Sequence, residues 1–202
     1  GKRIALIGEP GAGKTTTLQD IAFWVLEKDL GLPIWISLAD LRRNGNLIDL
    51  QTYLSDNWLN LAVLPSQKES AKQELETQIQ QGRVWLLLDG VDEVATSGLQ
   101  ILQHLSQQLI GWLAQSRVLL TCRLNVWQAD LNFLSDFETY RLLDFDYPQQ
   151  VHQFIHNWFG KKDVSKGERL KTELENPDKT RLRDLIQNPL RLTLLCSSWQ
   201  SN

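Results

Sequence analysis

The sequence predicts an α/β fold with a mainly parallel sheet, followed by a smaller helical part. Short apolar runs bounded by turn residues alternate with longer segments whose apolar residues recur every three or four positions, which is typical of strands alternating with helices. Several short runs are almost continuously apolar, as central strands covered on both faces are. After residue 143 only helical patterns follow. We therefore expect an α/β domain at 1–145 and a helical domain at 146–202.

Five segments carry the strand pattern, and the third ends in a charged residue, Asp89. They span residues 3–8, 33–38, 84–89, 117–122 and 139–143. Two leucine-rich stripes at helical spacing indicate helices in the segments between these strands. The first stripe is Leu47, Leu50, Leu54, Trp58 and Leu61, and the second is Leu99, Leu102, Leu105, Leu109 and Leu113. Residues 66–81 are polar and rich in Gln and Glu, which predicts an exposed helix.

The helical part begins near Pro148 and carries an apolar face that includes Val151, Ile155 and Phe159. Charged helices are expected at 166–175 and 179–187, and Pro189 opens a last apolar helix. The sequence stops directly after this apolar run and contains no Met. We therefore expect the chain to be a piece of a longer protein and its helical domain to be incomplete.

Composition excludes several classes of protein. The chain has 202 residues, of which 42% are hydrophobic, and a net charge of -3, so it is long enough for a core and lacks the basic character of a dedicated nucleic-acid binder. Its apolar runs fall short of the ~18 residues of a membrane helix. Cys122 and Cys196 are too far apart in sequence for a metal or redox pair. These features favour a cytoplasmic protein with no membrane or nucleic-acid partner.

The stretch GEPGAGKT, residues 8–15, fits the pattern GxxxxGK[ST] between an expected strand and an expected helix. Its glycines allow successive N–H groups to point at an anion at a helix N-terminus. Lys14 adds a charge for the β- and γ-phosphates, and the Thr15 hydroxyl is suited to Mg²⁺. A glycine-rich turn without a ligand does not explain the Lys-Thr pair. The expected nucleotide contacts are Gly8, Glu9, Pro10, Gly11, Ala12, Gly13, Lys14, Thr15 and Thr16.

Three carboxylates follow the third strand in the stretch VWLLLDGVDEV. Asp89 ends the strand, where open α/β sheets bind ligands, and we expect it to hold Mg²⁺ through water. Asp92 and Glu93 follow, and either one is a candidate general base for an attacking water. A solvated acidic loop is the alternative, and it does not explain the neighbouring phosphate loop.

The fourth strand ends in Arg123. At that position an arginine is placed to contact a γ-phosphate through charge-assisted hydrogen bonds. A surface cation at a strand end explains the residue equally well.

Taken together, these motifs resemble those of the NACHT domain, a member of the STAND class of P-loop NTPases. GEPGAGKTT resembles its Walker A motif, LLLDGVDEV its extended Walker B motif, and LLTCR its sensor 1. In the helical part, QQVHQFIHNWF resembles the first helix after the nucleotide-binding sheet, and NPLRLTLLC resembles the helix-opening proline motif. The resemblance implies a five-stranded parallel sheet in the order 5-1-4-3-2, Arg123 on the γ-phosphate side, and Pro189 packed against adenine.

The same resemblance implies a function. Such domains bind ATP or ADP with Mg²⁺ and work as switches, closed with ADP and open with ATP, with slow ATP hydrolysis between the two states. It also implies homo-oligomers in the ATP state and effector and sensor domains outside this chain.

Three other functions stay open at the level of sequence. One is a nucleotide-gated interaction module that binds ATP or ADP without significant turnover. Another is a GTPase, although no NKxD motif for guanine recognition occurs in the chain. The third is a motor of the AAA+ type, for which stable hexamers and fast basal turnover are expected.

Overall fold

The computed structural model describes residues 2–43, 46–47, 49–93, 98–129, 134–160 and 163–201. By its internal contacts the chain forms two compact units. The larger unit comprises Gly1–Gly8 and Lys14–Arg141, and the smaller one comprises Glu9–Gly13 and Leu142–Asn202. The division into domains at 1–145 and 146–202 stays a prediction.

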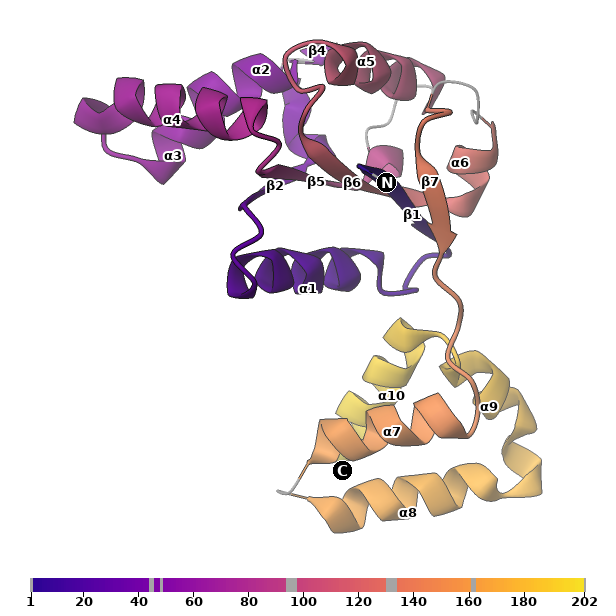
Figure 1. Ribbon diagram of the computed structural model, residues 1–202. Coiled ribbons are helices and arrows are strands. Elements are labelled where there is room, and N and C mark those ends of the chain that lie inside the picture. The colour runs from indigo at the N-terminus through magenta and orange to yellow at the C-terminus, as the bar shows by residue number, and fades with distance from the viewer. Residues whose placement is uncertain are drawn as a thin grey trace. The chain divides into compact units, whose positions relative to one another are not determined.

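The larger unit is built on a five-stranded parallel sheet (Figure 1). Its strands are β1 (Arg3–Gly8), β2 (Leu32–Ser37), β5 (Val84–Asp89), β6 (Arg117–Arg123) and β7 (Glu138–Arg141). They lie in the order β2-β5-β6-β1-β7. Counted along the five expected strands, this is the order 5-1-4-3-2, so the expected sheet is confirmed.

Burial along the strands follows their place in the sheet. Leu86, Leu87 and Leu88 in β5 are all fully buried, as expected for a central strand covered on both faces. β7 is exposed along its whole length and lies at one edge of the sheet.

Helices cover both faces of the sheet (Figure 1). On one face, Leu18 of α1 (Lys14–Glu27) packs among Leu6, Leu87 and Leu119. On the other, Leu102, Leu105 and Leu109 of α5 (Gly98–Ile110) join the larger core. Leu113 of the expected second stripe is buried as well, whereas the side chain of Leu99 lies outside the described part.

The remaining elements of this unit are short or peripheral. The polar segment forms α4 (Lys68–Gln80) after the turn η3 (Pro65–Gln67), with only Leu75 and Ile79 buried. The unit also contains η1 (Leu38–Leu41), β3 (Arg42–Arg43), β4 (Asn46–Leu47), η4 (Val91–Glu93) and α6 (Leu124–Ala129).

The first leucine stripe departs from the expected helix. The segment consists of α2 (Leu50–Thr52), a π-helical turn η2 (Tyr53–Trp58) and α3 (Leu59–Ala62). The Leu59 N–H donates to the carbonyl of Leu54, five residues earlier, and this wider turn shifts the phase of the helix. As a result Leu54 and Leu59 are buried, while Leu61 is 88% exposed. The expectation that Leu61 faces the core is wrong for this reason.

The smaller unit has a core of its own, formed by α7 (Gln149–Phe159), α8 (Val164–Glu175), α9 (Thr180–Ile186) and α10 (Pro189–Ser201). The turn η5 (Pro177–Lys179) precedes α9. Val151, Ile155 and Phe159 are the buried positions of α7, as the sequence predicts. Burial raises the pKa of the Cys196 thiol in α10 to about 11. At neutral pH this thiol is therefore uncharged and packs as part of the core.

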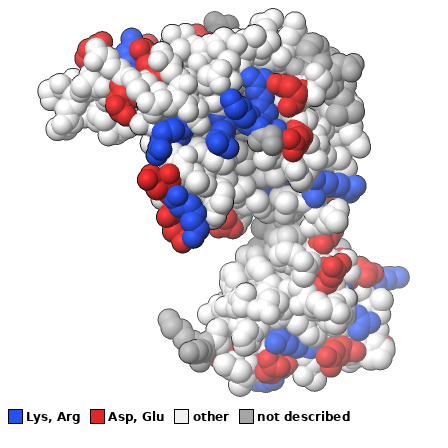
Figure 2. Space-filling model, in the orientation of Figure 1, with Lys and Arg blue, Asp and Glu red and all other residues white. Residues whose placement is uncertain are grey.

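Charges of both signs share the surface. On the face drawn in Figure 2, basic side chains form a small group on the larger unit with acidic side chains beside them, and the smaller unit carries both signs. This mixture agrees with the net charge of -3. Of the helices in the described part of the chain, none has the length and apolar character needed to cross a membrane.

The phase shift at η2 predicts unequal effects of two neighbouring leucines. Leu59→Ala removes a side chain that is 2% exposed and is expected to lower the free energy of unfolding by about 2–5 kcal/mol. Leu61→Ala, the matched control at 88% exposure, is expected to change it by less than about 0.5 kcal/mol. Urea unfolding measures both values. A larger loss for Leu61→Ala than for Leu59→Ala would instead indicate the regular helix that the hydrophobic spacing predicts.

Candidate functional site

The glycine-rich loop connects β1 to α1. Gly11 and Gly13 have φ values of 79° and 87°, a region that residues with a Cβ rarely adopt. Inside the loop the Ala12 N–H donates to the carbonyl of Glu9 at 3.2 Å. The loop thus needs glycine at two positions in order to turn before the helix.

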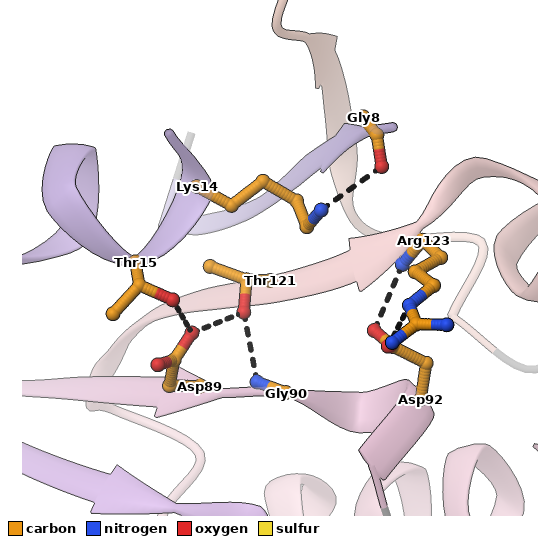
Figure 3. A network of polar contacts seen from close by, with 8 residues as sticks. All are labelled: Gly8, Lys14, Thr15, Asp89, Gly90, Asp92, Thr121 and Arg123. Atoms are coloured by element: carbon orange, nitrogen blue, oxygen red, sulfur yellow. Dashed lines mark hydrogen bonds and ion pairs between the residues drawn. The ribbon is translucent and has the colours of Figure 1, made fainter. Parts of the chain in front are cut away.

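The loop ends at the N-terminus of α1, whose first two residues are Lys14 and Thr15. The Lys14 Nζ donates to the carbonyl of Gly8 at 3.0 Å (Figure 3), so its ammonium group lies beside the end of β1. A helix of 14 residues also contributes a partial positive charge at this end. The region is therefore suited to an anion.

Asp89, at the carboxyl end of β5, accepts two hydrogen bonds on one oxygen (Figure 3). Thr15 Oγ1 donates to Asp89 Oδ1 at 3.1 Å, and Thr121 Oγ1 donates to the same atom at 2.6 Å. The Thr121 hydroxyl in turn accepts the Gly90 N–H at 2.8 Å. Thr121 is 1% exposed, so this hydroxyl is a fixed internal support that orients the carboxylate.

The side chains of Thr15 and Asp89 fit a magnesium ion. Both offer oxygen, the ligand type that Mg²⁺ prefers, and Mg²⁺ usually takes only one or two protein ligands beside water and phosphate oxygens. No group of three or more His, Cys, Asp or Glu side chains suited to a metal occurs among the residues that the structure describes. Thr15 and Asp89 are thus two oxygen donors that could contribute to a Mg²⁺ site.

Asp92 and Arg123 form a second polar pair beside the first (Figure 3). The backbone N–H of Arg123 donates to Asp92 Oδ1 at 2.9 Å, and its Nε lies 2.7 Å from Asp92 Oδ2. The Asp92 side chain is 6% exposed and that of Arg123 is 50% exposed. Asp92 in the turn η4 is thus bound to the end of β6.

The smaller unit contains the middle of the glycine-rich loop together with the start of α10. The Asn188 Nδ2 donates to the carbonyl of Pro10 at 3.2 Å, and the Leu190 N–H donates to the carbonyl of Gly11 at 3.2 Å. A Cβ on Gly11 would lie 2.8 Å from the Asn188 Oδ1. Pro189 is the first residue of α10 and is half-buried. The two hydrogen bonds hold the carbonyls of Pro10 and Gly11 at the start of α10.

Of the residues predicted from sequence, the structure brings five together at the ends of β1, β5 and β6. They are Lys14, Thr15, Asp89, Asp92 and Arg123. Thr16 is exposed on α1. Glu93 ends the turn η4, and its side chain lies outside the described part, so its expected role is not placed by the structure.

Sequence reasoning missed two residues, Thr121 and Asn188. Thr121 is a polar residue within the apolar run RVLLTC, and a buried polar residue in a central strand signals a specific partner. Asn188 directly precedes the helix-opening Pro189, a position typical of caps, which gives no sign of a contact with a distant loop.

The comparisons with known proteins identify a family. A family model described as the NACHT domain matches residues 2–162. The match spans the loop, both polar pairs and α7, and it ends before α10. The search of curated proteins finds no match.

The support that Thr121 gives to Asp89 predicts a stability effect. Thr121→Val keeps the shape but removes the partner of the buried Gly90 N–H, so it is expected to lower the free energy of unfolding by about 1–3 kcal/mol. Thr121→Ser, which keeps the hydroxyl, is expected to recover most of this loss. Chemical denaturation of the three proteins measures it, and a Val variant as stable as the parent would contradict the role.

Proposed function

The chain belongs to the NACHT domain family of P-loop NTPases and is thus a nucleotide-binding module, and from this premise we propose its specific activity. It binds ATP and ADP with Mg²⁺ and hydrolyses ATP slowly. The bound nucleotide switches a larger signalling protein between a closed and a self-associating state.

One observation carries the proposal: the hydrogen bond between Thr15 Oγ1 and Asp89 Oδ1 at 3.1 Å. It joins the helix that follows the glycine-rich loop to the end of β5, 74 residues later in the sequence. A phosphate-bound Mg²⁺ requires these two oxygen donors side by side. Two polar side chains that only faced solvent would have no reason to lie within hydrogen-bond distance of each other.

Each residue has a distinct part in the proposed reaction. The loop N–H groups and Lys14 bind the phosphates, and Thr15 and Asp89 hold Mg²⁺, with Thr121 orienting the carboxylate. The bound metal would neutralise charge on the β- and γ-phosphate oxygens. Arg123 contacts the γ-phosphate, and a carboxylate of the pair Asp92 and Glu93 accepts the proton of the attacking water.

The switch and its partners rest on family membership alone. We propose that the ATP state self-associates through the full-length protein, with effector and sensor regions outside this chain. Contact of Pro189 with adenine and a cytoplasmic location belong to the same proposal. A ligand shifts such a switch only by its different affinity for the two states.

Removing the loop lysine tests nucleotide binding. Lys14→Ala is expected to weaken the binding of Mg·ATP about ten- to a hundredfold, since one charge-assisted contact is worth roughly 1.5–3 kcal/mol. Lys28→Ala removes an equal charge just beyond the other end of α1, where Lys28 is exposed and pairs with Glu27, and should leave affinity unchanged. Calorimetric titration measures both variants, and equal affinities would contradict the use of the loop.

Removing the candidate base separates turnover from binding. Glu93→Gln is expected to abolish phosphate release from Mg·ATP while leaving affinity within about threefold of the parent, because it removes a proton acceptor and no phosphate contact. Phosphate release and calorimetry on the same samples measure the two quantities. A parent that binds ATP but releases no phosphate would instead support the interaction module without turnover.

A further inference from the structure

Asp92 is committed to Arg123 through both of its oxygens. Oδ1 accepts the backbone N–H at 2.9 Å, and Oδ2 lies 2.7 Å from Nε. The partners are 31 residues apart in sequence, so this contact fixes the turn η4 against the end of β6. One carboxylate therefore restrains both the backbone and the side chain of the same arginine.

The geometry leaves the outer part of the guanidinium available. Nε lies next to the aliphatic stem, and an arginine carries four further N–H donors on its two Nη atoms. No hydrogen bond from either Nη atom occurs among the residues that the structure describes. The Arg123 side chain is 50% exposed, so the Nη donors remain free to bind an anion while Asp92 holds the inner nitrogen.

The same contact is unfavourable for Asp92 as a general base. A general base needs an oxygen within hydrogen-bond reach of the attacking water. Oδ1 of Asp92 already accepts the Arg123 N–H and Oδ2 is ion-paired with Nε, and the side chain is only 6% exposed. A nearly buried carboxylate without its cationic partner would also strongly destabilise the folded protein. This cost keeps Asp92 paired with Arg123.

We infer that Asp92 is a positioning residue: it holds Arg123 so that the Nη donors face the γ-phosphate, and it thereby sets how strongly the site distinguishes ATP from ADP. This inference rests on the proposed function, since it requires that Arg123 contact a γ-phosphate. Of the two candidate general bases, Asp92 and Glu93, the inference leaves Glu93.

The test is the ratio of two affinities, that of ADP and that of a non-hydrolysable ATP analogue, each titrated with Mg²⁺ by calorimetry. In Asp92→Asn this ratio is expected to shift about tenfold against the analogue, with the affinity for ADP unchanged. Arg123→Ala is expected to produce the same shift. Since both substitutions disrupt one unit, the double variant should shift no further than either single variant.

A second variant keeps the test valid if Asp92→Asn fails to fold. Arg123→Lys retains a positive charge and the backbone N–H but has no Nε to pair with Asp92. It is expected to lose discrimination against ADP by a similar factor. Full discrimination in this variant would show that any cation suffices, and would overturn the role of Asp92.

The outcomes separate the inference from the proposed function. Asp92→Asn that keeps the parent ratio overturns the inference, whether or not its melting temperature falls. Loss of phosphate release with an unchanged ratio would make Asp92 the base instead. A parent chain that binds neither nucleotide would refute the proposed function and the inference together, whereas a parent that binds both and an Asp92 variant with a shifted ratio would support both.

Discussion

The parallel pairing of β5, β6 and β1 is the constraint on which the site depends. In this register Leu88 pairs with Leu120, and Gly8 pairs with Arg123, so three strands end at the same edge of the sheet. Each strand ends there in a polar group of the larger unit: the Gly8 carbonyl that accepts from Lys14 at the end of β1, Asp89 at the end of β5, and Arg123 at the end of β6. A shift of β5 against β6 by one residue would turn its side chains to the opposite face and separate Asp89 from Thr121.

Much of this arrangement could be predicted from the sequence because it rests on local patterns. The strands appear as continuous apolar runs, and the loop before Lys14 has glycines where positive φ values occur. In the predicted stripe before α4, Leu50 and Leu54 are buried and Trp58 packs against the core, but Leu61 is exposed. Hydrophobic spacing assumes 3.6 residues per turn, and one wider turn at η2 moved burial from Leu61 to Leu59.

The partners in these hydrogen bonds could not be predicted from the sequence, because each bond joins residues that are 31 to 178 positions apart. The sequence indicates that Asp89, Asp92 and Arg123 lie near strand ends, but not which carboxylate faces the arginine. That choice follows from the register of β5 and β6 and from the turn η4, which directs Asp92 toward the end of β6. Asn188 is a similar case, since nothing local in its sequence points to the carbonyl of Pro10.

Asp89 and Asp92 lie three residues apart, but their partners balance their negative charges to different extents. Asp89 accepts hydrogen bonds from two neutral hydroxyls on one oxygen, so its charge is not cancelled and remains available to a cation. Asp92 accepts the backbone N–H of Arg123 on Oδ1 and forms an ion pair with the Arg123 guanidinium through Oδ2, so its charge is balanced within the protein and has little attraction left for a metal. The acidic cluster of the sequence thus contains one carboxylate that is open to the proposed Mg²⁺ and one that is already paired with Arg123, and β6 contributes a donor to each of them.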